Sequence, residues 1–277
     1  MIATRSPDVV CQIAGVRVAV GGLPAGLRAR LRDLLAPFAT PAALRVPSEG
    51  AITITLRPDA AAGWVVVTPD GGARQFGDPD HLLRHLEWLV ASQAIAASAT
   101  RAAFHAAALT RDDETLLLLA KSGAGKTTLT LGLMARGWAP LADDIALLDA
   151  ETLAITAFPR CFHIAGATAA LLPVPGMVAP HGKLAGYARP LAWPAGAHVP
   201  TRIITVQRCE TCPSTREVAT LAEGAGALLS QALDTRLAPS RVAEVAARVA
   251  AGTRGCYRLR NGRLEGALNL IESALAR

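Results

Sequence analysis

One loop of the chain carries residues whose types and spacing suit phosphate chemistry. It lies between a short apolar run, residues 116–119, and a helical pattern that begins near residue 126. A small-residue loop at a helix N-terminus lets successive backbone N–H groups surround an anion where the helix dipole is positive. The residues expected to bind a nucleotide are Ala120, Lys121, Ser122, Gly123, Ala124, Gly125, Lys126, Thr127 and Thr128.

Several residues of such a phosphate-binding loop, or P-loop, have distinct chemical roles. Gly123 and Gly125 allow strained backbone angles and close approach to phosphate. Lys126 supplies a point charge for the outer phosphates, and the Thr127 hydroxyl suits a magnesium ion. The one departure is Ala120, which stands where G-x-x-x-x-G-K-[ST] has its first glycine. The alternative interpretation is a small-residue turn that happens to contain a lysine.

Lysine is rare in this chain, which makes the lysines of the loop informative. Only three of the 28 lysine and arginine residues are lysines, and two of those three, Lys121 and Lys126, lie in the loop. Because arginine dominates elsewhere, Lys126 indicates a requirement for a compact ammonium group.

Two acids and a histidine flank the loop in sequence. Asp143 and Asp144 precede an apolar stretch, residues 145–149, soon after the helix that follows the loop. A metal-binding or catalytic carboxylate belongs at such a place, although a capped turn between strands is the alternative. His105 lies between Phe104 and alanines, and the residues alone leave it open whether it is a satisfied core group or a functional one.

Composition and charge exclude several classes of protein. The chain of 277 residues is 51% hydrophobic and 18% charged, which is typical of a globular protein of one large or two smaller domains. Its net charge of +6 comes from scattered arginines without interleaved aromatics, so we expect no nucleic-acid partner. No apolar run approaches the ~18 residues of a membrane span and no signal peptide is evident, so we expect no membrane association and a cytoplasmic location.

The five cysteines fit reduced thiols better than a disulfide framework. Cys209 and Cys212 form a C-x-x-C, which is half of a zinc site or a redox pair. We interpret them as two thiols in a turn before Pro213, and the sequence does not decide whether they bind a metal.

Hydrophobic periodicity predicts a small α+β domain over residues 1–100 and an α/β domain over residues 101–277. In the first, a helix is expected from about His81 to Ala97, capped by Asp80, with His81 and His85 as surface residues. The other elements expected there are strands at 9–13, 16–20, 52–56, 64–67 and 74–76 and a helix at 25–35.

In the second domain, the polar turn at 111–114 and a glycine at Gly137 bound the elements around the loop. Residues 165–200 are rich in Gly, Pro and Ala, and loops this long are often functional lids. The elements expected are strands at 104–109, 115–119, 145–149, 203–206 and 256–259 and helices at 126–136, 220–233, 239–251 and 264–275.

Three segments together resemble one family. FHAAAL, LAKSGAGKTTLTLGLMARG and LADDIALLD, in this order and spacing, are similar to the HPr kinase/phosphorylase catalytic domain and most of all to its shorter relatives. Some of those relatives occur in gene clusters for modified peptides such as lasso peptides. The resemblance covers residues 104–153 well and the remainder of the second domain loosely. It implies an α/β P-loop kinase domain of the HPr kinase / PEP carboxykinase type with a small N-terminal α+β domain.

The resemblance also implies roles for particular residues. The histidine that precedes the family's P-loop matches His105, and its paired acids match Asp143 and Asp144. With Lys126 these are the expected catalytic residues, and Thr127, Asp143 and Asp144 are the expected metal ligands. Arg160, in Phe158-Pro159-Arg160, could match a basic residue near the acceptor. ATP and Mg²⁺ are the implied cofactors, and a homo-oligomer is implied.

The sequence thus predicts an ATP-dependent kinase that phosphorylates a serine of a peptide or small protein, such as a modified-peptide precursor. Phosphorylase activity is not expected, because the R-G-x-G segment of bifunctional members is missing and Arg254-Gly255 continues as Cys256-Tyr257. A small-molecule kinase and a nucleotide-binding regulatory protein are the alternatives. A PEP carboxykinase is disfavoured by the short chain and the lack of a carboxylate-binding arginine set.

Overall fold

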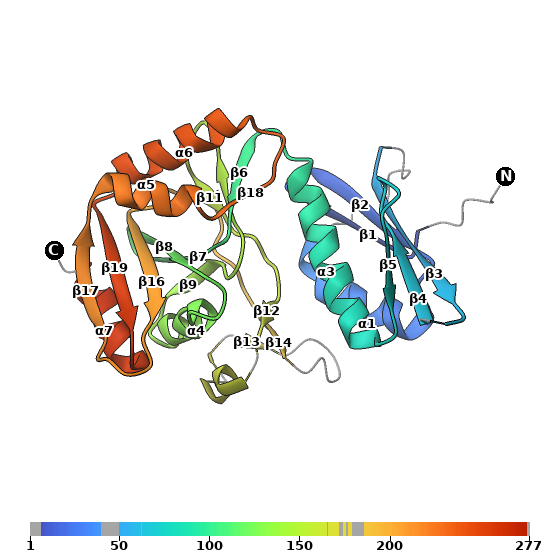
Figure 1. The fold of residues 1–277 in the computed structure, drawn as a ribbon, viewed down its shortest axis with the longest axis horizontal. Helices are drawn as coiled ribbons and strands as arrows, with labels where there is room; N and C mark the ends of the chain where they lie inside the picture. The colour runs from blue at the N-terminus through green and yellow to red at the C-terminus, as the bar shows by residue number, and fades with distance from the viewer. Residues whose placement is uncertain are drawn as a thin grey trace. The chain divides into compact units, whose positions relative to one another are not determined.

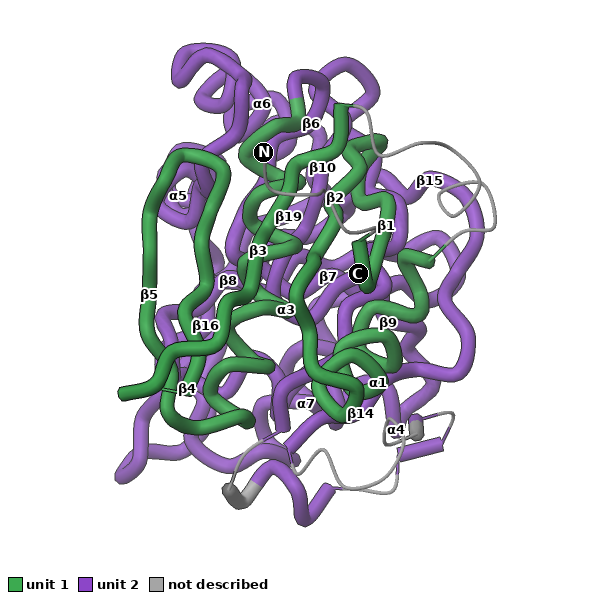
Figure 2. Tube along the Cα trace, turned by 90° about the vertical axis from the view of Figure 1, so that its right-hand side faces the viewer, with its two compact units in different colours: residues 1–98, 180–184 green, residues 99–179, 185–277 purple. Residues whose placement is uncertain are grey.

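The computed structural model describes residues 7–39, 50–61, 63–164, 166–171, 174–175, 177–178 and 186–275. It is a mixed α/β protein with several sheets. The chain forms two compact units that divide between Ser98 and Ala99, and Figure 2 colours them separately. No described helix is both long and apolar enough to cross a membrane.

The first unit is a five-stranded sheet in the order β1-β2-β3-β4-β5 with two helices, α1 and α3, against one face (Figure 1). All strand pairs are antiparallel except β2 with β3. Alternation of apolar residues along the strands directs Val18, Val20, Ile54, Leu56 and Val66 into the core. The elements are β1 (Val9–Ile13), β2 (Val16–Gly21), α1 (Ala25–Leu35), η1 (Ala36–Phe38), β3 (Ile52–Asp59), β4 (Gly63–Val67), β5 (Ala73–Phe76) and α3 (Pro79–Ala96).

The start of α3 differs from the sequence prediction. The N-cap is Asp78, whose carboxylate accepts the N–H of His81 at 2.6 Å, and not Asp80. Pro79 at the first helical position explains the shift, because its fixed φ suits a helix start and its missing N–H needs no partner. Asp80 instead forms an ion pair with Arg30 of α1.

The second unit is organised around a six-stranded sheet in the order β17-β19-β16-β8-β7-β9. The three central strands, β8, β16 and β19, are parallel, and β7, β9 and β17 run antiparallel to their neighbours. The elements are β7 (Ala106–Arg111), β8 (Glu114–Ala120), α4 (Lys126–Ala135), β9 (Ala139–Ala142), β16 (Arg202–Arg208), β17 (Thr215–Ala219), α5 (Leu221–Leu229), α6 (Pro239–Gly252), β19 (Gly255–Asn261) and α7 (Leu264–Ser273).

Helices cover both faces of this sheet (Figure 1). Ile204 and Val206 of β16 belong to the core cluster that includes residues of α4 and α7. Ile203 points to the other face, where it lies near Gly224 of α5. The parallel strands are therefore buried on both sides, which explains the continuous apolar run of β8.

Two small sheets complete the second unit. One has the order β15-β11-β10-β6-β18 and the other the order β12-β14-β13. Their strands are β6 (Arg101–Phe104), β10 (Ala146–Asp149), β11 (Ile155–Thr156), β12 (Phe162–His163), β13 (Met177–Val178), β14 (Tyr187–Pro190), β15 (Ala197–His198) and β18 (Ala232–Leu233), and η2 (Gly166–Leu171) is a short 3-10 helix.

Several element predictions are wrong in detail. The single strand expected at 104–109 is two strands, β6 and β7, in different sheets, with His105 between them. The helix expected at 220–233 ends at Leu229, and Ala232–Leu233 pairs with β6 as β18. Strand β17 was not predicted. The predicted lid at 165–200 falls partly outside the described residues, and its described part contains η2 and β13 to β15.

The prediction of five reduced thiols is also wrong. Cys209 and Cys212, in the turn after β16, form a disulfide with their Cα atoms 5.7 Å apart. The turn brings the two residues within the Cα separation that disulfides need. The other three cysteines, Cys11, Cys161 and Cys256, are buried and are not part of a disulfide.

Substitutions at two glycines of the first unit would show how closely other atoms approach its backbone. Gly22 has φ +82° and a Cβ there would lie 2.0 Å from the Leu56 carbonyl oxygen, whereas Gly15, with φ +84°, has open space around it. We expect Gly22→Ala to lower the free energy of unfolding by about 3 kcal/mol or more, and Gly15→Ala by only about 1 kcal/mol. Chemical denaturation followed by circular dichroism measures both. Equal losses would contradict the close approach at Gly22.

Candidate active site

The candidate P-loop joins β8 to α4. Strand β8 ends at Ala120, and α4 begins at Lys126 with Gly125 as its N-cap. Gly125 has φ +94° and Gly123 has φ +79°, both in the left-handed region that favours glycine. The two glycines therefore shape a loop that directs backbone N–H groups toward one point at the helix N-terminus.

Ala120 is explained by its place in the strand. It pairs with Val206 of β16, is only 3% exposed, and does not have a positive φ. The position needs a small side chain rather than the conformational freedom of glycine, so alanine fits. The departure from the usual P-loop pattern thus leaves the backbone of the loop unaffected.

Asn261, at the end of β19, supports the loop from the side. Its Nδ2 donates to the Ala124 carbonyl at 3.3 Å. A Cβ at position 125 would lie 2.8 Å from this Nδ2, so a larger residue there would push the Asn261 amide away from the loop, and the φ of +94° itself favours glycine. Sequence reasoning missed Asn261, because 137 residues separate it from Ala124 and no motif marks it.

The Lys126 ammonium is buried and faces two of the predicted residues. Its Nζ lies 2.9 Å from His105 Nε2 and 3.4 Å from Asp144 Oδ1. Burial lowers the pKa of Lys126, and the charges of Asp144 and Asp143 oppose that effect. The two carboxylates therefore favour the charged ammonium, against the effect of burial.

His105 occupies the break between β6 and β7. Its backbone N–H donates to the Gln231 carbonyl at 2.7 Å, and its Nδ1 lies 3.1 Å from Asp144 Oδ1. Burial lowers the pKa of His105, which favours the neutral imidazole. The geometry fits a proton on Nδ1 that is donated to Asp144, with Nε2 accepting from Lys126.

Asp144 is the centre of this cluster. In addition to Lys126 and His105, Arg160 NH1 lies 3.3 Å from its Oδ2. Burial alone would raise the pKa of Asp144, but the charges of Lys126 and Arg160, together with the adjacent His105, outweigh it and hold the pKa below its usual value. Asp144 is thus an ionised carboxylate, and its side chain is 43% exposed, so a reactant can reach it.

Asp143 has a different environment. Its Oδ2 accepts from the Thr127 hydroxyl at 3.0 Å, while its Oδ1 is buried without a hydrogen-bond partner among the described residues. Burial and the neighbouring charge of Asp144 raise the pKa of Asp143 to about 7. A buried carboxylate oxygen with no partner, beside a hydroxyl, suits a hard cation such as Mg²⁺. The described residues hold no cluster of three or more His, Cys, Asp or Glu that would bind a metal unaided.

The structure therefore brings some predicted site residues together and leaves others outside. His105, Lys126, Thr127, Asp143, Asp144 and Arg160 form one connected group. Lys121, Ser122 and Gly123 are exposed along the loop. Thr128 turns away and bonds Thr168 of η2 through their hydroxyls at 2.8 Å.

A pocket of about 460 Å³ opens on the other side of the loop. Its walls come from the loop, the end of β16 and the last turn of α5 and the residues that follow it. It is lined by Leu119, Ala120, Lys121, Ser122, Gly123, Ala124, Thr205, Val206, Gln207, Arg208, Ala227, Ser230 and Gln231. None of the residues around Asp144 lines it, so the loop separates the pocket from the charged cluster.

Comparisons with known proteins add little to this geometry. No family model matches the chain, and no curated protein matches it. One similar solved structure is the Hpr(Ser) kinase/phosphatase from Coxiella burnetii, at 14% sequence identity and a TM-score of 0.31. The match covers 63% of this chain and 96% of that chain. It shows a distant structural relation only.

The two lysines of the loop provide a matched test of the anion site. Lys126 is buried against the charged cluster, and Lys121 is exposed. We expect Lys126→Ala to weaken tripolyphosphate binding by at least about tenfold, because the ammonium makes a charge-assisted contact in a partly desolvated site. Lys121→Ala should change it by no more than about threefold. Isothermal titration calorimetry measures both, and equal effects would contradict the assignment of Lys126.

Proposed function

We propose that the chain is an ATP-dependent kinase that transfers the γ-phosphate to a hydroxyl group. The observation that carries the proposal is the ionised, accessible Asp144, held by His105, Lys126 and Arg160 beside the glycine loop. Phosphoryl transfer needs a cradle for the phosphates, cations near the transferred group and a carboxylate near the attacking hydroxyl. The glycine loop supplies the cradle, Lys126 and Arg160 supply the cations, and Asp144 supplies the carboxylate.

The nucleotide phosphates would bind the backbone N–H groups of the loop and the Lys126 ammonium. Thr127 and Asp143 would hold Mg²⁺, which would neutralise charge on the outer phosphates. The partnerless Oδ1 of Asp143 supports this choice, since a buried oxygen without a donor is costly unless a cation binds it. The sequence left the roles of the two acids open, and this geometry favours Asp143 for the metal.

Asp144 would then accept the proton of the attacking hydroxyl. The hydroxyl oxygen bonds to the γ-phosphorus, the bond from that phosphorus to the β–γ bridging oxygen breaks, and ADP leaves with the bridging oxygen. A carboxylate of low pKa is sufficient, because in a loose transition state the proton is lost late. His105 would orient Asp144 through Nδ1, and Arg160 would contact the transferred phosphoryl group or the acceptor.

In this proposal, the nucleoside would occupy the pocket on the far side of the loop. The γ-phosphate end must lie at Lys126, Thr127 and the acids, so the remainder of the nucleotide extends away from them. The pocket beside Lys121 to Ala124 offers apolar walls and polar groups from Thr205, Gln207 and Gln231. Its volume of about 460 Å³ is within the range of small-ligand sites.

For the acceptor, we propose a serine of a peptide or small protein, with Arg160 and the exposed edge of Asp144 facing it. A small-molecule acceptor fits the same chemistry. A regulatory protein that only senses nucleotide would need the loop and not Asp144 with its contacts to His105, Lys126 and Arg160, so the kinase is preferred.

Substitution of Asp143 and substitution of Asp144 should impair the activity in different ways. We expect Asp143→Asn to raise the Mg²⁺ concentration needed for half-maximal activity, because a metal ligand is weakened. Asp144→Asn should lower kcat by about 10²-fold or more at unchanged Mg²⁺ dependence, since the proton acceptor is lost. ADP release and phosphate transfer to candidate peptides are measured in parallel, with Asp113→Asn, on the exposed β7–β8 turn, as the control. Near-normal turnover in both site variants would contradict the proposed kinase activity. ATP binding by the wild type without any phosphate transfer would contradict it as well.

The pocket assignment has its own test. Ala227 lines the pocket from α5, and Ala222 is exposed elsewhere on the same helix. We expect Ala227→Trp to weaken ATP binding by about tenfold or more, because the indole fills the space for the nucleoside. The same variant should bind tripolyphosphate normally, and Ala222→Trp should bind both like the wild type. If Ala227→Trp binds ATP normally, the nucleoside lies elsewhere.

A further inference from the structure

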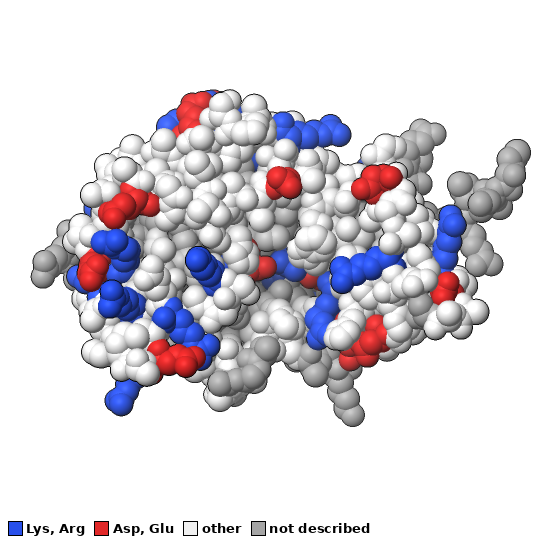
Figure 3. Space-filling view, viewed as in Figure 1, with Lys and Arg blue, Asp and Glu red and all other residues white. Residues whose placement is uncertain are grey.

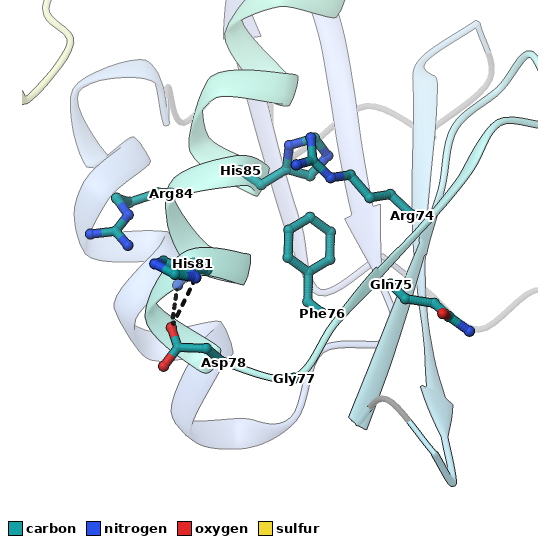
Figure 4. Close-up of a pocket in the computed structure, with 8 residues that line it drawn as sticks. All are labelled: Arg74, Gln75, Phe76, Gly77, Asp78, His81, Arg84 and His85. Carbon is teal, nitrogen blue, oxygen red and sulfur yellow. Dashed lines mark hydrogen bonds and ion pairs between the residues drawn. The ribbon is translucent and has the colours of Figure 1, made fainter.

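The first unit contains a groove between a strand edge and a helix, which the proposed kinase chemistry does not use. It has a volume of about 360 Å³ and lies between β5 and the first turns of α3 (Figure 4). Its lining residues are Arg74, Gln75, Phe76, Gly77, Asp78, His81, Arg84 and His85.

The strand side of the groove presents an open edge. Strand β5 is the last of its sheet and pairs only with β4 among the described residues. At the turn, the Thr68 N–H donates to the Gly72 carbonyl, and hydrogen-bonded pairs alternate along antiparallel strands. Arg74 and Phe76 therefore bond to β4, whereas the backbone N–H and C=O groups of Ala73 and Gln75 point outward. An open edge of this kind can accept another strand.

The floor of the groove, where β5 faces α3, presents a stack of rings and a guanidinium. The Arg74 guanidinium lies 5.3 Å from the Phe76 ring centroid, and the His85 ring is 4.8 Å from that of Phe76 (Figure 4). Trp88, one helical turn further, lies 6.0 Å from His85 and is 49% exposed. This surface offers apolar contact next to a positive charge.

The charge of Arg74 is not matched within the groove. No carboxylate forms an ion pair with Arg74 among the described residues. Asp78 is engaged as the cap of α3, where it accepts the N–H of His81, and Asp80 pairs with Arg30. Arg84 adds a second cation on α3, so the groove is complementary to an acidic group.

We propose that this groove binds an extended peptide segment with acidic side chains, which adds to β5 as an outer strand. The peptide backbone would bond to Ala73 and Gln75. On the α3 side, one acidic side chain would pair with Arg74 and the next side chain on that face would pack on His85 and Trp88. The proposal stands on the first unit alone and does not depend on phosphotransfer.

The test uses the full chain and a fluorescein-labelled octapeptide, Glu-Thr-Val-Thr-Glu-Thr-Val-Thr, in which glutamate and valine alternate along one face of the extended chain. Binding is followed by fluorescence anisotropy. We expect saturable binding that Arg74→Glu weakens by about tenfold, because a charge-assisted contact becomes a repulsion. Arg57→Glu is the matched control, since Arg57 lies on β3 and its register with Val65 and Gln75 places it on the other face of the sheet. It should leave binding within about twofold of the wild type.

The backbone contact is tested at Gln75. Gln75→Pro removes an outward N–H without breaking a bond to β4 and should weaken binding, whereas Gln75→Ala keeps that N–H and should not. Thermal unfolding checks that every variant is folded. The proposal is overturned if the wild type shows no saturable binding, or if the same peptide with lysine in place of each glutamate binds as well. Binding that is lost in Arg74→Glu but kept in Gln75→Pro would mean a side-chain anion site and would overturn strand addition.

Discussion

The contact between Lys126 and Asp144 is the interaction on which the candidate site depends. A buried ammonium is costly unless a carboxylate lies close, and an ionised carboxylate in this place needs cations around it. The 3.4 Å pair therefore sustains the charge on both groups. His105 and Arg160 extend it into a network in which each member holds its neighbour in place. In the proposed reaction, the same charges that stabilise Asp144 would stabilise a phosphoryl group.

Two adjacent acids with opposite pKa shifts show how local environment assigns different tasks to identical side chains. Asp143 is buried and accepts a hydrogen bond from the Thr127 hydroxyl, and burial raises its pKa to about 7. Asp144 is more accessible, and although burial opposes the shift, Lys126, His105 and Arg160 together lower its pKa. The first arrangement favours a bound cation and the second an ionised proton acceptor. The chain needs a single turn after β9 to present both.

The local part of this arrangement could be predicted from the sequence, and the long-range part could not. The strand, loop and helix around Gly123 to Lys126 follow from apolar runs and glycine spacing, which act over a few residues. The break at His105 was missed, because alanines on both sides give one continuous apolar pattern and only the pairing of β6 and β7 with different sheets separates them. Asn261 was missed because its contact with the loop depends on which strands become neighbours. The disulfide is local, and it was missed because the C-x-x-C spacing fits two free thiols, half of a zinc site and a redox pair alike. The cap of α3 was misplaced by two residues, since both Asp78 and Asp80 are good caps and Pro79 decides between them.

The hydrogen bond from Asn261 to the loop has a consequence for the order of events during synthesis. The Ala124 carbonyl and its donor are separated by 137 residues, and β19 must pair with β16 before Asn261 reaches the loop. A ribosome therefore exposes the loop well before it has made the strand that supports it. Contacts with so large a sequence separation form late in folding. The nascent chain thus carries its candidate P-loop without a finished site, and competence for the proposed reaction would arrive only with the last strand of the sheet.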